Sequence, residues 1–163
     1  IKAGQKLDEL QESSKKSSTA LVSLTVDHIM HEPLSTSHTK IAQKSLESLL
    51  TILKNAHKIG IKIIVLPLLE QASLKDKPED FRRMLVALKK IISVGKKYGM
   101  KFVIENDLSV SDQKKLVKEC NNQIGICYDT GNRTYFGYIP FEEILELGRL
   151  IWHIHIKDKN QEG

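Results

Sequence analysis

Short runs rich in β-branched residues alternate along the chain with longer stretches in which hydrophobic residues recur every three or four positions. Each short run is apolar nearly throughout, which is typical of parallel strands buried on both faces. These runs are residues 20–26, 61–67, 100–105, 124–129 and 151–157. We therefore predict five parallel strands separated by amphipathic helices.

The helical periodicity is clearest over residues 41–56 and 81–94, and shorter helices fit residues 111–120 and 140–147. Pro140 suits the first turn of the last of these helices. The segments HKIGIKIIV and KKYGMKFVI repeat one pattern, in which a helix ends, a glycine follows and a strand begins. We expect Gly60 and Gly99 to take positive φ there, because glycine adopts that conformation without steric cost.

Strand and helix alternate without a hairpin signal, which predicts an α/β fold with a parallel sheet. Two architectures fit: an open doubly wound sheet and a (β/α) barrel. The chain has neither a GxGxxG nor a GxxxxGK[ST] loop, which an open sheet that binds nucleotides would favour. Polar residues at several strand ends favour the barrel. A complete barrel needs about 250 residues and eight strands, so we expect residues 1–163 to form one partial barrel domain of TIM type, with about five of eight βα units.

The composition is that of a globular protein, with 40% hydrophobic and 28% charged residues. The net charge is +5, but the lysines are dispersed among glutamates, which disfavours a nucleic-acid partner. The two cysteines, Cys120 and Cys127, cannot form a disulfide framework, and free thiols predict a cytoplasmic location. No apolar run approaches the ~18 residues that span a bilayer, so we expect no membrane segment.

Acidic and imidazole side chains stand at the ends of three successive strands. Glu105, Asp129 and His155 are separated by 24 and 26 residues, one βα unit each. A carboxylate at the end of a buried strand is costly without a charged or metal partner. Two carboxylates and one imidazole suit Mn²⁺, Mg²⁺ or Co²⁺, and are compatible with Zn²⁺. The alternative for each acid is an ordinary helix cap or loop residue.

Other candidates carry weaker signals. His28, His31 and Glu32 either line the same rim after the first run or belong to an ordinary loop. Of the two histidines in the last run, we expect only one to face the barrel axis, while the other packs against helices. Cys127 lies inside a strand, which predicts a core residue rather than a nucleophile.

Three motifs resemble the xylose isomerase-like TIM barrels, a superfamily of sugar phosphate isomerases and epimerases, ketose 3-epimerases and AP endonucleases. The motifs are VIEN (103–106), GICYDTGN (125–132) and HIHIKD (153–158), and the five runs correspond to barrel strands two to six. The resemblance implies a metal ion held by Glu105, Asp129 and His155, with a further Glu from a last strand that the chain lacks. It also implies that Glu105 is catalytic in proton transfer, and that Lys157 and Asp158 lie near the substrate.

Two departures from the family pattern qualify this reading. The usual D-T-G-H reads D-T-G-N here, so that Asn132 can bind a substrate hydroxyl but is a poor metal ligand. Leu66 and Pro67 stand where the endonucleases place a metal-binding histidine, which disfavours phosphodiester hydrolysis.

We therefore expect a metal-dependent isomerase or epimerase that acts on a small sugar or sugar phosphate. The alternative is a non-catalytic relative that binds a ligand or partner. An open five-stranded arc has two exposed edges, which favour a homo-oligomer.

Overall fold

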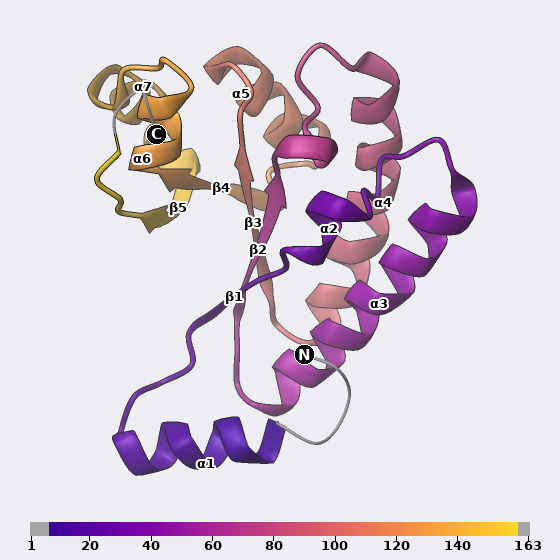
Figure 1. Cartoon of the computed structure of the whole chain (residues 1–163), viewed down its shortest axis with the longest axis vertical. Coiled ribbons are helices and arrows are strands. Elements are labelled where there is room, and N and C mark those ends of the chain that lie inside the picture. The colour runs from indigo at the N-terminus through magenta and orange to yellow at the C-terminus, as the bar shows by residue number, and fades with distance from the viewer. Residues whose placement is uncertain (1–6, 160–163) are drawn as a thin grey trace.

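The computed structural model describes residues 7–159 and contains one parallel sheet that curls into half a barrel (Figure 1). The strand order is the order of the sequence, so each strand pairs with the strands before and after it. The predicted partial barrel is thus confirmed. The strands are β1 (Ser23–Thr25), β2 (Ile63–Leu68), β3 (Lys101–Asn106), β4 (Ile124–Asp129) and β5 (Ile151–His155).

Three long helices cover one face of the sheet: α3 (Thr39–Lys58), α4 (Pro78–Lys97) and α5 (Val110–Glu119). The main hydrophobic core lies between these helices and alternate residues of the strands, such as Ile64, Phe102 and Ile126. The other face of the sheet carries only a small apolar cluster around Val65, Val103 and Cys127, packed against Ile63. The concave face therefore has room for polar chemistry.

The two repeated glycines behave as the sequence predicts. Gly60 follows α3 with φ +84°, and Gly99 follows α4 with φ +63°. In each case the next residue donates its backbone N–H back into the helix, Ile61 to Ala56 and Met100 to Gly95, both at 3.0 Å. Each glycine thus turns the chain from a helix directly into a strand.

Three helices have no counterpart in the hydrophobic pattern: α1 (Leu7–Ser17), α2 (His28–His31) and α6 (Thr130–Tyr135). The helix α1 is almost entirely polar, with Leu7 as its one buried residue, and the other two are shorter than two turns. The edge strands are shorter than predicted, since β1 spans three residues and β5 ends at His155. The remaining elements are α7 (Pro140–Leu147) and the 3₁₀ turns η1 (Glu70–Ala72) and η2 (Gly148–Leu150).

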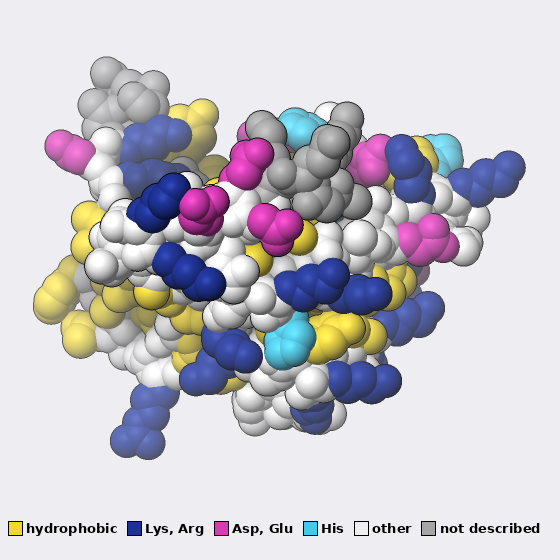
Figure 2. All heavy atoms as spheres, turned by 90° about the horizontal axis from the view of Figure 1, so that it is seen from below, with side chains coloured by type: hydrophobic (Ala, Val, Ile, Leu, Met, Phe, Trp, Pro, Cys, Tyr) yellow, Lys and Arg dark blue, Asp and Glu magenta, His cyan; other side chains and the backbone are white. Residues whose placement is uncertain are grey.

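The surface is mixed in character. Figure 2 shows lysine and arginine side chains spread over one end of the molecule, with acidic side chains between them. Hydrophobic surface gathers on the left of that view, the side on which α6, α7 and β5 lie in Figure 1. Exposed residues of α7 and β5 include Phe141 at 73%, Leu145 at 70% and Ile154 at 51%. No helix within residues 7–159 is both long and apolar enough to cross a membrane.

Candidate metal centre

The three strand-end residues that the sequence singled out converge on the concave face. Glu105 lies near the end of β3, while Asp129 and His155 are the last residues of β4 and β5. His155 Nδ1 lies 3.2 Å from Glu105 Oε2 and 3.6 Å from Asp129 Oδ2. One potential ligand atom from each of the three residues lies within 4.8 Å of the other two. Parallel strands bring them together because their carboxyl ends meet at one edge of the sheet.

The two oxygens of Asp129 have different surroundings. Asp129 Oδ1 accepts a hydrogen bond of 2.9 Å from the backbone N–H of Asn132 and so caps α6. Asp129 Oδ2 is buried and accepts no well-directed hydrogen bond within the described residues. Its nearest cation is the Lys157 ammonium at 2.6 Å, in an ion pair whose lysine side chain is 51% exposed. One oxygen of Asp129 therefore caps α6, and the other pairs with Lys157.

Electrostatics separates the two carboxyl groups. Burial and the charge of Asp129 raise the pKa of Glu105 above its usual 4.5. Burial also acts to raise the pKa of Asp129, but the Asn132 N–H and the Lys157 ammonium outweigh it and lower that pKa below 3.8. The hydrogen bond to Asp129 raises the pKa of Lys157. Asp129 is thus the stable anion of the pair, while Glu105 binds a proton more readily.

Asn132 and Lys157 also lie at this cluster. Asn132 Nδ2 donates to Glu105 Oε1 at 2.7 Å and so orients that carboxylate. A Cβ on Gly131 would lie 2.7 Å from Lys157 Cβ, so glycine lets the segment after β5 approach α6. Asp158 is exposed, and the described residues give its side chain no hydrogen bond or ion pair.

A hollow of about 630 Å³ opens above this cluster. Its wall comes from the carboxyl ends of several strands and the loops that follow them, including Thr25, Asp27, Pro67, Glu70, Glu105 and His155. Asn132 and Lys157 also line it. The hollow therefore lies where TIM barrels place their chemistry.

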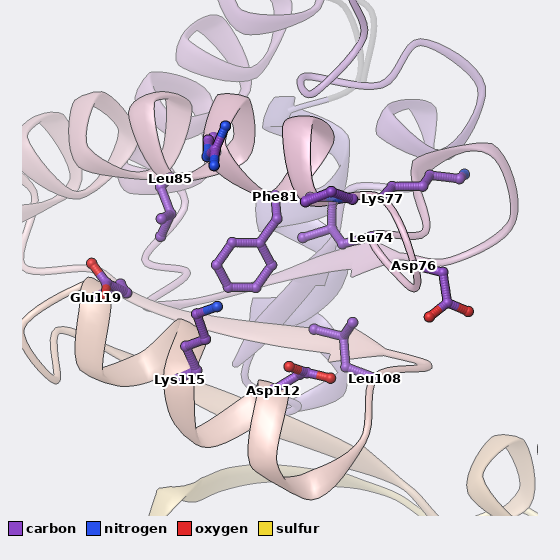
Figure 3. Close-up of a pocket in the computed structure, with 11 residues that line it drawn as sticks. Leu74, Asp76, Lys77, Phe81, Leu85, Leu108, Asp112, Lys115 and Glu119 are labelled. Carbon is purple, nitrogen blue, oxygen red and sulfur yellow. The ribbon is translucent and has the colours of Figure 1, made fainter.

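A second hollow, of about 470 Å³, lies between α4 and α5 on the helical layer (Figure 3). Phe81 points into it, with Leu85 beside it and the Lys115 ammonium 5.3 Å from the centre of the Phe81 ring. None of the strand-end residues lines this second hollow. The carboxylates with shifted pKa values, Glu105 and Asp129, lie on the concave face instead, which makes that face the candidate site.

The expectation that only one of His153 and His155 faces the axis is wrong. Residues two apart in a strand share a face, and both imidazoles are half-buried on the same side of β5. Their ring centres lie 5.2 Å apart, with the planes nearly perpendicular. The sequence carried this signal in the spacing H-x-H. Burial lowers the pKa of His153, and the charge of His155 lowers it further.

The other weak candidates fall outside the cluster. The segment with His28 and His31 forms α2, where His28 Nε2 lies 3.5 Å from the carbonyl oxygen of Ser45 in α3. Cys127 is a buried residue, as predicted, and burial raises the pKa of its thiol to about 12.

Sequence reasoning missed a buried ion pair beside the site. Arg133 of α6 contacts Glu143 of α7 through two hydrogen bonds, one of them from Nε to Oε2 at 2.8 Å. Tyr128 donates its hydroxyl to the same Oε2 at 2.8 Å, and Arg133 Nη1 donates to the carbonyl of Asn106 at 3.2 Å. No local sequence motif predicts this ion pair, because Arg133 and Glu143 lie on separate helices. The pair fixes α6, and with it Asn132, against the sheet.

The family model for xylose isomerase-like TIM barrels matches residues 3–163. The chain belongs to this family. The match confirms the resemblance drawn from the three strand-end motifs. No curated protein sequence matches the chain.

Solved structures of sugar-converting TIM barrels share the fold. An E. coli 3-keto-D-glucoside 4-epimerase superposes with a TM-score of 0.76 at 15% identity, over 94% of this chain and 64% of that one. A D-psicose 3-epimerase crystallised with D-fructose gives 0.80 at 17% identity, over 94% and 57%. An IOLI protein with a bound zinc atom gives 0.74 at 18% identity, over 94% and 57%. This TIM barrel chain thus spans less than two thirds of the length of these neighbours.

Proposed function

We propose that the chain carries the metal-binding part of a divalent-metal-dependent isomerase or epimerase that acts on sugars or sugar phosphates. The convergence of Glu105, Asp129 and His155 from three successive strands carries this proposal. Two carboxylate oxygens and one imidazole nitrogen form a donor set that suits Mn²⁺, Mg²⁺ or Co²⁺ and accepts Zn²⁺. The buried Oδ2 of Asp129 supports the fit, since its nearest cation, the Lys157 ammonium, belongs to a half-exposed side chain.

In this proposal Glu105, Asp129 and His155 hold the cation at the carboxyl ends of the strands. A bound divalent cation there polarises the carbonyl and hydroxyl oxygens of an open-chain sugar. Lys157 balances part of the negative charge, because its ammonium lies against Asp129 Oδ2. Its charge and exposure also suit it to bind a hydroxyl or a phosphate group of the substrate.

Glu105 is the proposed catalytic residue. It takes a proton from the sugar carbon next to the carbonyl. In an isomerisation it returns the proton to the neighbouring carbon, whereas in an epimerisation a second carboxyl group delivers a proton to the opposite face. Its pKa is raised by burial and by the charge of Asp129, so its carboxylate is more basic than that of an ordinary glutamate. Asn132 holds Glu105 Oε1 and offers the remaining capacity of its side-chain amide to a substrate hydroxyl. Asp158 is exposed and follows Lys157, which lines the hollow. It is the third proposed substrate-binding residue, with Asn132 and Lys157.

Deuterium exchange tests this proposal directly. The chain is incubated with Mn²⁺ and a panel of ketoses and ketose phosphates in D₂O, and NMR follows deuterium at the carbon next to the carbonyl. We expect incorporation with the wild type and none above background with Glu105→Gln. The surface variant Glu79→Gln is the control, because Glu79 is exposed in α4 and far from the hollow's lining. Equal incorporation with and without Glu105 would reject the catalytic assignment.

We further propose that residues 1–163 act as one domain, which associates with a second copy through its exposed sheet edges. Within the described residues β1 and β5 are the two edge strands of the sheet. The unpaired backbone N–H and C=O groups of an edge strand can pair with a strand of another chain. Next to β5, the side chain of Ile156 is 87% exposed, and the exposed hydrophobic residues of α7 continue the surface. Analytical ultracentrifugation should show a dimer that Ile156→Lys weakens. A monomer at all concentrations would exclude this association.

The two cysteines are consistent with the cytoplasmic location that we propose. Both are free and buried, as expected in a reducing compartment.

A further inference from the structure

A second cluster of potential metal ligands lies on the concave face, one row deeper than the first. One ligand atom each from Cys127, His153 and His155 lies within 4.8 Å of the other two. The first row pairs Asp129 with His155 across β4 and β5, and the deeper row pairs Cys127 with His153. His155 belongs to both groups, because its side chain lies between the two rows.

The deeper row has different surroundings from the rim. Cys127 is 2% exposed and packs with Val65 and Val103, so its thiol stands on the apolar floor of the half-barrel. His153 and His155 are half-buried and form the open side of the cluster. The thiol thus has apolar neighbours on one side, and the two imidazoles are its more exposed partners.

The donor chemistry of the deeper row is softer than that of the rim. One thiolate and two imidazoles form a set that zinc and other thiophilic divalent ions prefer, whereas Mg²⁺ and Mn²⁺ prefer carboxylates. Around a tetrahedral zinc ion the ligand atoms lie about 3.5 Å apart, given the usual zinc–sulfur and zinc–nitrogen distances. The three ligand atoms now lie within 4.8 Å of one another and have to move closer to reach that spacing, and three protein ligands leave the fourth position open.

We propose that Cys127, His153 and His155 form a second binding site, for a thiophilic divalent cation such as Zn²⁺, which is an alternative to the carboxylate site. Binding forms one metal–sulfur and two metal–nitrogen bonds, and the proton of the Cys127 thiol leaves to solvent. Because His155 serves both groups, a cation in the deeper site withdraws an imidazole from Glu105 and Asp129. The deeper site is thus an inhibitory position for the proposed function. Its existence depends only on the geometry of the three ligands.

Cobalt absorption spectroscopy tests this site without any activity assay. Co²⁺ bound to a thiolate gives a charge-transfer band in the near ultraviolet, which carboxylate and imidazole ligands do not give. We expect this band at one equivalent of Co²⁺ in the wild type and its loss in Cys127→Ser. The matched control is Cys120→Ser, because Cys120 is also buried and free but lies at the end of α5. That variant should keep the band.

A second pair of variants keeps the test decisive if Cys127→Ser folds poorly. His153→Gln should retain the band but weaken Co²⁺ affinity by at least about tenfold, since even outer partners of a metal contribute about 10- to 100-fold. Asp129→Asn should keep the band, because the deeper site does not use Asp129. The proposal is overturned if the band is absent in both the wild type and Asp129→Asn, in which the carboxylate site is weakened. It is also overturned if the band is lost in Cys120→Ser and retained in Cys127→Ser. Failure of the proposed function gives a different result, namely Mn²⁺ binding that does not depend on Asp129.

Discussion

Two groups of buried charged side chains lie next to each other at the carboxyl end of β4, and they differ in how completely their charges are paired. Tyr128 and Asp129 are neighbours in that strand, and their side chains point to opposite faces. Tyr128 joins Arg133 and Glu143, where one positive and one negative charge meet in several hydrogen bonds. Asp129 joins Glu105 and His155, where two carboxylates face one half-exposed lysine.

The difference indicates which group stabilises the fold and which is available for a ligand. In the first group the Arg133 guanidinium is paired with Glu143, donates to a backbone carbonyl and lies 3.7 Å from the centre of the Tyr138 ring. In the second group a buried oxygen of Asp129 lacks a directed hydrogen bond and the pKa of Glu105 is raised. Electrostatic incompleteness of this kind is typical of functional sites rather than of structural ion pairs.

The largest expected effect is a loss of folding stability when the buried ion pair of Arg133 and Glu143 is broken. Arg133→Met should lower the free energy of unfolding by about 3–5 kcal/mol, because it leaves the Glu143 carboxylate buried without a partner. Urea denaturation measures this loss. In the exposed pair of Arg82 and Glu79, Arg82→Met should cost less than about 1 kcal/mol. Similar losses for the two variants would mean that the buried pair has no special structural role.

The next largest effect is a loss of metal affinity when the negative charge of the buried Asp129 is removed. Asp129→Asn should weaken Mn²⁺ binding by about 100-fold or more, since it removes a charged ligand where even outer partners contribute about 10- to 100-fold. Isothermal titration calorimetry checks this, with Glu79→Gln as the surface control. Unchanged affinity would show that the three strand ends do not form the metal site.

A smaller effect, of opposite sign, is expected on the stability of the metal-free protein. The folded-state pKa of Glu105 is raised, so its contribution to stability is present below about pH 4.5 and is lost as the pH rises through the folded value. Because glutamine does not ionise, Glu105→Gln removes the cost of burying a carboxylate at this position. The variant should therefore raise the free energy of unfolding at neutral pH by about 1 kcal/mol.

The pH dependence distinguishes Glu105 from Asp129. The lowered pKa of Asp129 gives stability that is present above about pH 3.8 and is lost as the pH falls through the folded value. Denaturation of the wild type and Glu105→Gln from acidic to neutral pH should therefore show curves that separate as the pH rises. Parallel curves would mean that folding does not raise the pKa of Glu105.

The smallest effect concerns the lysine that competes with a cation for Asp129 Oδ2. Lys157→Met should strengthen Mn²⁺ binding, but by less than about tenfold, because the Lys157 side chain is half-exposed and its ion pair is screened. The gain should shrink as salt is added. Titration at low and high salt measures both effects, and weaker binding without Lys157 would show that the lysine organises the site instead.

The fold and the convergence of the three strand-end residues were predictable from sequence for a common reason. Parallel strands buried on both faces produce apolar runs, and their carboxyl ends share one edge, so Glu105, Asp129 and His155 could be brought together from spacing alone. The glycines after α3 and α4 were predictable because positive φ selects glycine.

The features that escaped prediction depend on contacts between distant elements. The pair of Arg133 and Glu143 forms only when α6 and α7 pack together, and nothing in either helix specifies the partner. The helix α1 escaped because a polar helix has no hydrophobic period. The shared face of His153 and His155 was readable from their spacing and was misassigned.

The order of the strands has a consequence for how the molecule opens. Because spatial order follows sequence order, each βα unit hydrogen-bonds only to the units before and after it, as in a repeat array. Amide hydrogen exchange should therefore be slowest in β3, at the middle of the sheet, and fastest in β1, the three-residue edge strand. Such an array can gain or lose a unit at either edge without rearranging the interior. The cluster of Glu105, Asp129 and His155 on β3, β4 and β5 therefore stays intact when the hydrogen bonds of β1 open.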